Sequence, residues 1–571
     1  MEENNHKSVL VIFGKELPKK SKKWFKRFDE IITKDELEKL VGAGSVQKAY
    51  ELVNSLSHLT LPNGSRLSKS INWRGYELWW LHYDSLYNNF CLPYTQYDSL
   101  LFRLKDFKKV YLFQPPHPSL FHYFLKAYGR ECFVLDSFHL RKLLPIPSGV
   151  VVQLALSVIF LPWLMIRRRR LMVFTSDKFD PPNDYDFRYK FIYTELRKRK
   201  ILFAEFIRSL EPVLVVLRHA WKRKRPVFYS AACIFLIYSF TALFCRKKKL
   251  IEEAVFSEPE RRFQFLMATH YVRNFAGTIW AVRLVGLILR LIGVKSAIIT
   301  TGCDRTFHEL LACKLVNIKA VGIQHGAQMK NYNVYDFMPE FDGEKKLSLD
   351  RYGLWSDWWK QYFLYNSRAF GPEQLFVAGP MRPLAEKRWP TDGGLGRDGD
   401  RLRVLYISEG LAAPAEVLPY ILTILETKDF ELYFKFRPYR DGFELWLREN
   451  QPEIYKKILG RSRILRGAME EAIAQCDVVV GSHSNATLEA LLQLKPPVFF
   501  RTQKWGDYFE IKNSESGDYF FAENPEELIE KIRKSTNVPK EDLEELQKRF
   551  YGDPYQNGSK WVVDRVQELL D

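Results

Sequence analysis

Short apolar runs rich in β-branched residues recur along the chain, and segments of helix length separate many of them. In the first part of the chain these runs predict strands at 9–14, 108–114, 132–136, 170–177, 295–302, 319–325, 351–356 and 375–379. Helices are expected between the later strands, at 305–315 and 357–366. Continuous apolar strands that alternate with helices are typical of parallel sheets covered on both faces. We therefore predict an α/β fold.

A loop-like segment rich in proline and glycine, 381–401, separates this series from a second one. The second series predicts strands at 403–408, 431–438, 476–481 and 496–501. A helix is expected at 415–427, and two helices are expected to close the chain. The pattern predicts two Rossmann-like, doubly wound lobes joined by this linker: an N-terminal lobe over 1–380 and a C-terminal lobe over 402–571.

Two long apolar stretches lie inside the N-terminal lobe, and tetrabasic clusters flank both. The first, 149–166, runs into four arginines at 167–170, and the second, 226–245, lies between the clusters 222–225 and 246–249. Each has roughly the length that crosses a bilayer. If both crossed, two clusters would lie outside, against the positive-inside tendency. If only one crossed, the membrane would separate the two lobes.

We therefore expect membrane-associated stretches over 149–170 and 222–249 that lie in the inner leaflet, with their basic side chains against anionic headgroups. The alternatives are two buried core helices with solvated basic ends, or a two-span hairpin. A third stretch, Trp280 to Val294, is expected to be a packed helix. These expectations predict a monotopic or peripheral protein on the cytoplasmic face of the cell membrane.

The charge balance fits the same division of the chain. The net charge is +18, yet residues 391–571 hold 25 Lys and Arg against 32 Asp and Glu, so the positive excess lies in 1–390. We find no RNA-recognition signature, zinc finger or helix-turn-helix, and nucleic acid is not an expected partner. The seven cysteines form no CxxC pair, which favours a reduced cytosolic compartment. The N-terminal segment lacks the long apolar core of a secretory signal peptide, so no such peptide is expected.

The segment VVVGSHSNATLEAL, 478–491, changes abruptly from a strand pattern to polar residues and then to a helix pattern. Ligands of open α/β sheets bind at the carboxyl ends of strands, and anions settle at helix N-termini. The polar groups expected to bind a phosphate or pyrophosphate there are Gly481, Ser482, Ser484, Asn485 and Thr487, with His483 directed at either phosphate or base. Glu489 is placed to accept hydrogen bonds from ribose hydroxyls. The alternative is an ordinary helix start capped by Ser484 or Asn485.

Five segments resemble GT-B glycosyltransferases. GSHSNATLEALLQLKPPVFF, 481–500, resembles their donor-site segment, and GIQHGAQ, 322–328, resembles the His-Gly element of capsule and polyol-phosphate transferases. The pieces at 353–363 and 375–383 resemble the approach to the lobe linker. FKFRPYRD, 434–441, resembles a strand-end basic element but has Arg-Pro-Tyr where His-Pro is often found. The resemblance covers about 295–535 and is closest to bacterial surface-carbohydrate (capsule and O-antigen) biosynthesis proteins.

The resemblance implies an acceptor-side N-terminal lobe, a nucleotide-donor lobe at 402–571, and a catalytic role for the His325–Gly326 pair. A neutral histidine can take a proton from an acceptor hydroxyl near pH 7, although a structural histidine in a turn is the alternative. Lys435 and Arg437 are expected to neutralise diphosphate charge, and Glu409 to touch the nucleotide or donor sugar. Candidates on the acceptor side are Trp73, Tyr76, Glu77, Asp84, Asp304 and Arg305.

No Asp-x-Asp motif has a convincing loop context, so neither a metal nor a cofactor beyond the nucleotide-sugar substrate is expected. The sequence thus predicts a membrane-associated, metal-independent glycosyltransferase. Its expected partners are a nucleotide-sugar, a lipid-linked or polysaccharide acceptor and an anionic inner-membrane surface. Two alternatives stay open: a CDP-polyol phosphotransferase that transfers glycerol- or ribitol-phosphate, and a non-catalytic membrane scaffold in polysaccharide assembly.

Overall fold

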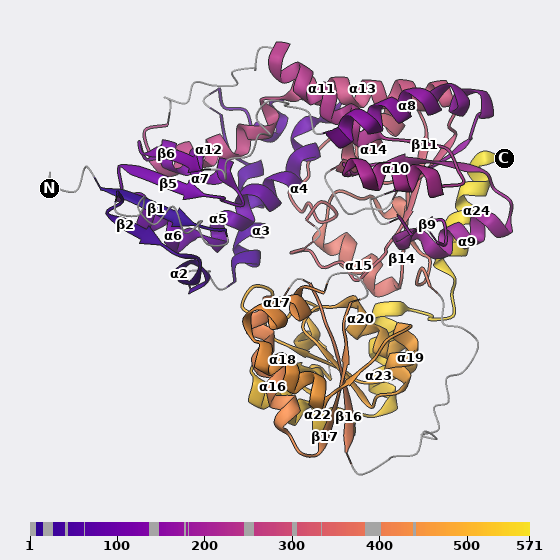
Figure 1. Cartoon of the computed structure of the whole chain (residues 1–571). Helices are drawn as coiled ribbons and strands as arrows, with labels where there is room; N and C mark the ends of the chain where they lie inside the picture. The colour runs from indigo at the N-terminus through magenta and orange to yellow at the C-terminus, as the bar shows by residue number, and fades with distance from the viewer. Residues whose placement is uncertain are drawn as a thin grey trace.

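The computed structural model of the chain (Figure 1) contains three parallel sheets. It describes residues 7–14, 27–39, 44–61, 63–135, 148–175, 179–180, 182–244, 256–299, 305–332, 334–382, 401–410, 412–437, 441–514 and 516–571. The expected linker, apart from its ends, and the basic cluster 246–249 lie outside these residues.

The C-terminal lobe has a six-stranded, wholly parallel sheet of order β18-β17-β16-β19-β20-β21. Alternate residues of β16 face opposite sides: Val404 and Tyr406 belong to one hydrophobic cluster, and Leu405 and Ile407 to another. Helices therefore cover both faces, as Figure 1 shows. The strands are β16 (Leu402–Ile407), β17 (Phe430–Lys435), β18 (Arg463–Ile464), β19 (Val478–Gly481), β20 (Pro497–Phe500) and β21 (Phe521–Ala522).

The N-terminal lobe has a seven-stranded parallel sheet of order β11-β10-β7-β12-β13-β14-β15. If the strands of each sheet are numbered along the chain, both sheets have the order 3-2-1-4-5-6, and the N-terminal sheet adds a seventh strand at its edge. This is the doubly wound Rossmann order. The strands are β7 (Leu171–Thr175), β10 (Phe203–Ile207), β11 (Val227–Phe228), β12 (Ser296–Ile299), β13 (Lys319–Ile323), β14 (Arg351–Leu354) and β15 (Leu375–Val377). The predicted pair of Rossmann-like lobes is confirmed.

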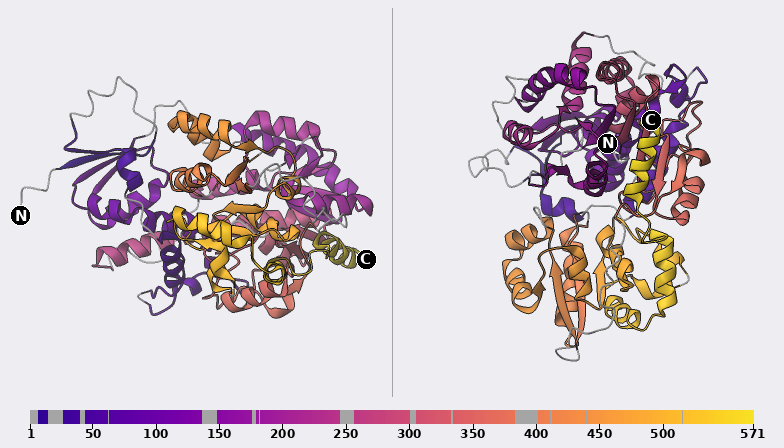
Figure 2. Two further views of the ribbon diagram at one scale, coloured as in Figure 1. Left: turned by 90° about the horizontal axis from the view of Figure 1, so that it is seen from below. Right: turned by 90° about the vertical axis from the view of Figure 1, so that its right-hand side faces the viewer.

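A third, separate sheet of order β2-β1-β5-β6 precedes the N-terminal lobe. Figure 1 and the left view of Figure 2 show it to one side of both lobes. The predicted strands at 9–14, 108–114 and 132–136 thus do not join the sheet that carries the later strands, because strand spacing along the sequence does not say which strands pair. Its strands are β1 (Ser8–Ile12), β2 (Glu30–Ile32), β5 (Lys109–Phe113) and β6 (Glu131–Leu135).

Helices of the N-terminal lobe and its preceding sheet fill the spaces between strands. They are α3 (Ser45–Ser57), α6 (Asp98–Leu104), α7 (Pro118–Ala127), α8 (Ser148–Arg167), α9 (Lys190–Lys198), α10 (Val213–Lys222), α11 (Ser230–Phe244), α12 (Pro259–Val272), α13 (Phe275–Ile292), α14 (Arg305–Leu315) and α15 (Asp357–Asn366). The C-terminal lobe has α16 (Pro414–Glu426), α17 (Gly442–Asn450), α18 (Pro452–Arg461), α19 (Met469–Ala474), α20 (Asn485–Leu488), α22 (Pro525–Ser535) and α23 (Lys540–Tyr551).

The last helix, α24 (Gly558–Leu570), returns to the N-terminal lobe and packs on α9 and β13 (Figure 1). Asp564 forms an ion pair with Arg199 at 2.6 Å, and Glu568 forms one with Arg351 at 2.7 Å. A Cβ on Gly558 would lie 2.5 Å from the Gly379 carbonyl oxygen, so only glycine fits this crossing. The C-terminal segment therefore ties the lobes together and does not end within the lobe that precedes it.

The two apolar stretches differ in structure. The first forms α8, whereas the second begins as strand β11 and becomes helical only at α11, so it is not one helix of bilayer length. By length and composition alone, Ser148–Arg167 and the run Pro259–Ile292 could cross a membrane, and 28% and 50% of their apolar windows are buried in the protein. The expected packed helix at 280–294 belongs to α13, whose buried face includes Val282, Val285 and Leu289.

Not all side chains of the basic cluster 222–225 point outward. The expectation that this cluster contacts lipid headgroups is therefore wrong in part. Glu205, on β10, forms ion pairs with Arg223 at 3.2 Å and with Arg225 at 2.9 Å. Arg225 also pairs with Asp184 at 2.9 Å. Two of the four cations thus balance buried carboxylates, because an unpaired charge at these sites would be costly.

Three histidines gather in the helical layer of the N-terminal lobe. His82 stacks on Tyr271 with 5.3 Å between ring centres, and its Nε2 lies 3.2 Å from Thr278 Oγ1. Burial lowers the pKa of His82 to about 3, and the neighbouring His308 and His270 add to that shift. His82 is therefore neutral in the folded protein at pH values where an unfolded histidine is already protonated.

This burial makes stability depend on pH. Because the unfolded chain binds a proton below about pH 6.5 and the folded chain does not, the free energy of unfolding should fall as the pH decreases. The His82→Gln variant should lose that contribution, which has a slope of up to about 1.4 kcal/mol per pH unit. Urea titrations of both proteins between about pH 7 and about pH 5 measure the difference. Equal slopes would contradict this role of His82.

Candidate functional site

The candidate site lies at the carboxyl ends of the strands of the C-terminal lobe. The strand order reverses between β16 and β19, and ligands of doubly wound sheets bind at such a switch point; we call the region between the loops after these two strands the crevice. The loop after β16 carries Glu409, the loop after β17 carries Arg437, and the turn after β19 holds 481–485. The sequence therefore placed three separate segments correctly at one edge of one sheet.

Glu409 crosses the switch point and holds the turn after β19. Its Oε1 accepts a hydrogen bond from the Ser482 N–H at 2.6 Å, and its Oε2 accepts one from the His483 N–H at 3.0 Å. The Ser482 hydroxyl also contacts Glu409. These amides were expected to bind phosphate, and in this structure the carboxylate occupies them. Glu409 therefore shapes the turn, and its expected contact with the donor stays a prediction.

The turn after β19 also contacts the N-terminal lobe. Ser484 caps α20 by accepting from the Ala486 N–H at 3.2 Å, as the alternative interpretation expected. Asn485 Oδ1 accepts from the Ala327 N–H at 2.9 Å, which joins the two lobes directly. A Cβ on Gly326 would lie 2.4 Å from Asn485 Nδ2. The glycine after His325 thus admits the Asn485 side chain.

His325 is exposed beside this contact between the lobes. The residues on either side of it are held by buried glutamines: Gln324 accepts from the Trp355 N–H at 3.1 Å, and Gln328 accepts from the Tyr352 hydroxyl at 2.8 Å. The Gln328 Nε2 lies 3.4 Å from His325 Nδ1. A rigid backbone therefore presents the imidazole, which is the arrangement that a positioned base requires.

Lys435 and Arg437 are not equivalent. Lys435 Nζ donates to the Gly467 carbonyl at 2.9 Å, and burial lowers the pKa of this lysine. Arg437 is exposed, and its Nη1 lies 2.2 Å from the place that a Cβ of Gly410 would take. Glycine at 410 lets the guanidinium lie over the loop that carries Glu409. Arg437 is thus the stronger candidate for an incoming phosphate.

Thr487 and Glu489 have polar atoms that are not engaged in hydrogen bonds with other described residues. Thr487 Oγ1 is buried without a partner among them. Glu489 is half-buried, and burial raises its pKa while Arg382 opposes that shift. Buried polar groups of this kind normally have partners, so a ligand with hydroxyl groups fits these two side chains.

Sequence patterns did not predict that several aromatic side chains lie around His483. The His483 ring centre lies 5.5 Å from Trp505 and 5.7 Å from Tyr508, and Tyr332 of the N-terminal lobe lies 5.4 Å from Trp505. Trp505 and Tyr508 follow β20, so the same strand-end argument could have found them. The Gly44 N–H donates to the Gln503 carbonyl at 3.3 Å, so the N-terminal sheet unit also reaches this loop.

Cations act on these rings. Desolvation raises the pKa of Tyr332, and the charges of Arg188 and Arg437 oppose the shift. Lys504 lies over the Trp505 ring with its Nζ 5.0 Å from the ring centre. Arg188 and Lys504 were not predicted, because each stands alone in a loop without a basic motif.

His483 has one ring nitrogen that no other described residue satisfies. Its Nδ1 lies 2.6 Å from Ser482 Oγ, whereas its Nε2 is buried without a partner among the described residues. Burial lowers the pKa of His483, with Glu409 opposing, so the ring is neutral. Because Ser482 Oγ–H donates to Glu409, the network assigns the ring proton to Nδ1 and leaves Nε2 as an acceptor.

The acceptor-side candidates are dispersed. Glu77 accepts from Lys69 at 2.8 Å and from Trp80 at 3.0 Å, which makes it a structural carboxylate. Asp84 accepts from Asn88 at 3.0 Å, and its charge contributes to the raised pKa of Tyr332. Cations cover one face of each remaining ring: Arg283 over Trp73 and Lys345 over Tyr76. Asp304 and the side chain of Arg305 lie outside the described residues.

The described residues contain no group of three or more His, Cys, Asp or Glu side chains that could hold a metal ion. The five cysteines within the described ranges are free thiols.

No protein-family model matches the chain, and no curated protein matches it. Among solved structures, it is similar to S. aureus MnaA in a co-structure with UDP (TM-score 0.40, 11% identity, 70% of this chain and 97% of that one). It is also similar to Acinetobacter baumannii MurG (0.41, 12%, 70% and 99%) and to Anabaena Alr3699/HepE in complex with UDP (0.39, 14%, 70% and 99%). What this chain binds must follow from its own residues.

The Glu409 contacts generate a stability prediction. In a Glu409→Ala variant the buried N–H groups of Ser482 and His483 lose their acceptor, and each such loss costs roughly 1–3 kcal/mol. The free energy of unfolding from urea titration should therefore fall by at least about 2 kcal/mol. Glu453→Ala is the matched control, because Glu453 is an exposed carboxylate of the same lobe. Similar values for the two variants would contradict the bridging role of Glu409.

Proposed function

We propose that this protein is a membrane-associated glycosyltransferase that moves a sugar from a nucleotide-sugar to a lipid-linked or growing surface glycan. The observation that carries the proposal is the contact, at the switch point of the C-terminal lobe, between the turn after β19 and the loop that bears His325. Asn485 and Ala327 make this contact at 2.9 Å. Donor and acceptor substrates of a transferase must meet at such a junction.

The crevice offers different chemistry along its length. His483 Nε2 is an acceptor on a neutral ring, so it suits a base N–H or a sugar hydroxyl and not a phosphate oxygen. Thr487 and Glu489 suit ribose hydroxyls. The aromatic rings of Trp505 and Tyr332 supply a surface on which a flat base can stack.

The phosphate groups need positive charge. Arg437 lies over the loop that carries Glu409, and Lys504 lies over the Trp505 ring; the charge of Arg188 also acts on Tyr332. Side-chain cations placed where charge develops on a leaving phosphate can stabilise it without a divalent ion. His325 is then the base that takes the proton from the acceptor hydroxyl.

This mechanism predicts separate effects for two variants. His325→Ala should lower turnover by about 10²–10⁴-fold, the usual contribution of a general base, with donor binding nearly unchanged. Arg437→Ala should weaken donor binding as well as turnover, because its charge meets the bound phosphate in both states. The measurement is hydrolysis and transfer over a panel of UDP-, GDP-, dTDP- and CMP-sugars, with EDTA expected to leave activity in place.

His122→Ala is the control for His325, because His122 is an exposed histidine on α7. If the protein turned over CDP-glycerol or CDP-ribitol and no nucleotide-sugar, it would instead be a polyol-phosphate transferase. Normal turnover in His325→Ala would remove the proposed base, and a chain that bound no nucleotide would be a scaffold.

The membrane part of the proposal depends on α8, which buries two polar side chains and exposes several large apolar ones. Its inward face carries Gln153, which donates to the Ser209 carbonyl at 3.0 Å, and Ser157, which accepts from the Tyr229 N–H at 3.0 Å. Its outward face carries Val158 and Ile166, which are 71% and 78% exposed. A helix with polar groups inside and apolar groups outside fits an apolar surrounding.

Helix α10 packs beside α8 and extends this surface. Leu214, Leu217 and Trp221 share one face of α10 at helical spacing and are 82%, 48% and 87% exposed. Arg218 and Lys222 are exposed beside them. Apolar and aromatic side chains next to basic ones are the pattern of a helix that lies in the membrane interface. The arginines 167–170 at the end of α8 add positive charge to the same region.

The surface predicts binding to anionic vesicles. In a flotation assay with phosphatidylglycerol vesicles the protein should float with the lipid, and added salt should weaken binding because it screens the headgroup attraction. Leu214→Glu should lower the partition coefficient by about tenfold or more, since a buried leucine contributes about 1.5–3 kcal/mol. Tyr365→Glu is the control, because Tyr365 is 90% exposed on α15. Equal flotation of both variants would contradict this orientation.

A further inference from the structure

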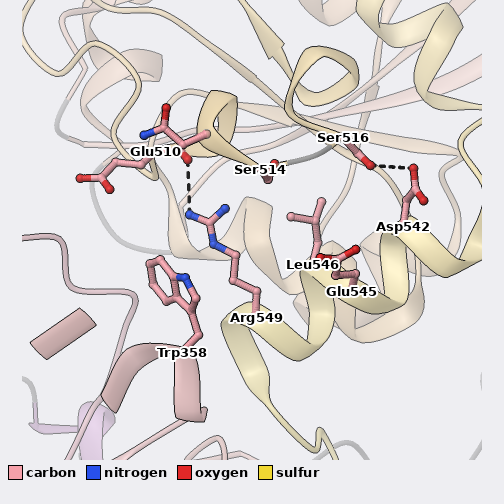
Figure 3. A pocket seen from close by; sticks show the side chains of 9 residues that line it. Trp358, Glu510, Ser514, Ser516, Asp542, Glu545, Leu546 and Arg549 are labelled. Atoms are coloured by element: carbon pink, nitrogen blue, oxygen red, sulfur yellow. Dashed lines mark hydrogen bonds between the residues drawn. The ribbon is translucent and has the colours of Figure 1, made fainter. Parts of the chain in front are cut away.

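A cavity of about 410 Å³ opens where α15 of the N-terminal lobe meets α23 and the segment after β20 (Figure 3). None of the residues expected to bind donor or acceptor lines it. Its walls include Trp358, Glu510, Asn513, Asp542, Glu545 and Arg549. A cavity of this size is typical of sites for small organic ligands.

One wall of the cavity is held firmly. The Arg549 guanidinium carbon lies 4.4 Å from the centre of the Trp358 ring, and its Nη2 donates to the Glu510 carbonyl at 3.3 Å. Next to it, the Trp359 Nε1 donates to the Phe550 carbonyl at 2.9 Å. These contacts fix α23 to α15, so the cavity is bounded by both lobes and keeps a defined shape.

Several polar groups in this wall have capacity left for a ligand. Arg549 Nε is buried without a partner among the described residues. Glu510 accepts from the Tyr362 hydroxyl through Oε1 only, at 3.2 Å, which leaves Oε2. The side chains of Asn513 and Glu545 make no hydrogen bond or ion pair with the described residues. The cavity thus presents unsatisfied donors and acceptors together.

The charges of the side chains that line the cavity exclude some classes of ligand. Three carboxylates, Glu510, Asp542 and Glu545, face one guanidinium, so a phosphate or carboxylate ligand would be repelled. A cation could bind to the carboxylates, but it could not accept the hydrogen bonds that Arg549 and Asn513 donate. Hydroxyl groups donate and accept, and they can satisfy both kinds of partner. Leu546 and the edge of Trp358 offer apolar contact for the C–H face of a ring (Figure 3).

We propose that this cavity binds a neutral sugar residue, at a site separate from the crevice that holds the nucleotide. Hydroxyls of the sugar donate to Glu510 and Glu545 and accept from Arg549 and Asn513. Because Trp358 belongs to the N-terminal lobe and the four polar groups belong to the C-terminal lobe, a bound sugar contacts both lobes at once. The proposal is independent of the donor chemistry, since it involves no residue of the crevice.

The test is saturation-transfer NMR on the full chain in a detergent without a sugar headgroup. Glucose, N-acetylglucosamine and their disaccharides are the probes, and inorganic phosphate is the anionic comparison. We expect signals from ring protons of at least one saccharide, unaffected by excess UDP. Asn513→Ala combined with Glu545→Ala should weaken that binding by at least about tenfold, because two hydrogen-bond partners are lost.

Glu541→Ala is the matched control, since Glu541 is an exposed carboxylate on the same helix α23. It should bind the saccharide as the unaltered chain does. The proposal is overturned if no probe saccharide gives a signal, if UDP displaces it, if phosphate binds in preference, or if the Asn513→Ala, Glu545→Ala protein binds as well as the control.

Discussion

The whole site depends on the bridge that Glu409 makes across the switch point of the C-terminal sheet. The turn between a strand and the start of the next helix leaves backbone N–H groups without a helix or sheet partner, and the strand order reverses at this point. Glu409 accepts from the Ser482 and His483 N–H groups. The bridge fixes the turn after β19, so His483 faces the aromatic rings and Asn485 faces the other lobe. Loss of the bridge would release both contacts together.

The contact between Asn485 and Ala327 extends this arrangement across the two lobes. Gly326 permits the approach, and α24 reinforces it by returning the chain to the N-terminal lobe. Helices α8 and α10, which carry the exposed apolar and basic side chains, belong to that same lobe. A rigid junction therefore connects an apolar, basic surface to the crevice, which is the geometry that a transferase acting on a lipid-linked acceptor requires.

Sequence patterns predicted the two lobes and the strand-end position of the crevice, because apolar periodicity and turn residues are local signals. They did not predict that β1, β5 and β6 form their own sheet, because pairing is a long-range choice. They assigned the turn amides to phosphate, since nothing local shows that Glu409, over seventy residues earlier, takes them. Arg223 and Arg225 were read as surface charge because Glu205 and Asp184 are separated from them in sequence. Trp505 and Tyr508 were overlooked although they follow a predicted strand.

The central claim is that a nucleotide occupies the crevice at the switch point. Hydrogen–deuterium exchange of the full chain, with and without each nucleoside diphosphate of uridine, guanosine, cytidine and thymidine, tests it most directly. At least one nucleotide should slow exchange in the backbone segments 408–410, 481–487 and 502–508, and in 326–332 of the opposite lobe. Exchange that is unchanged in these segments with every nucleotide, or protection confined to the cavity beside Trp358, would contradict the account.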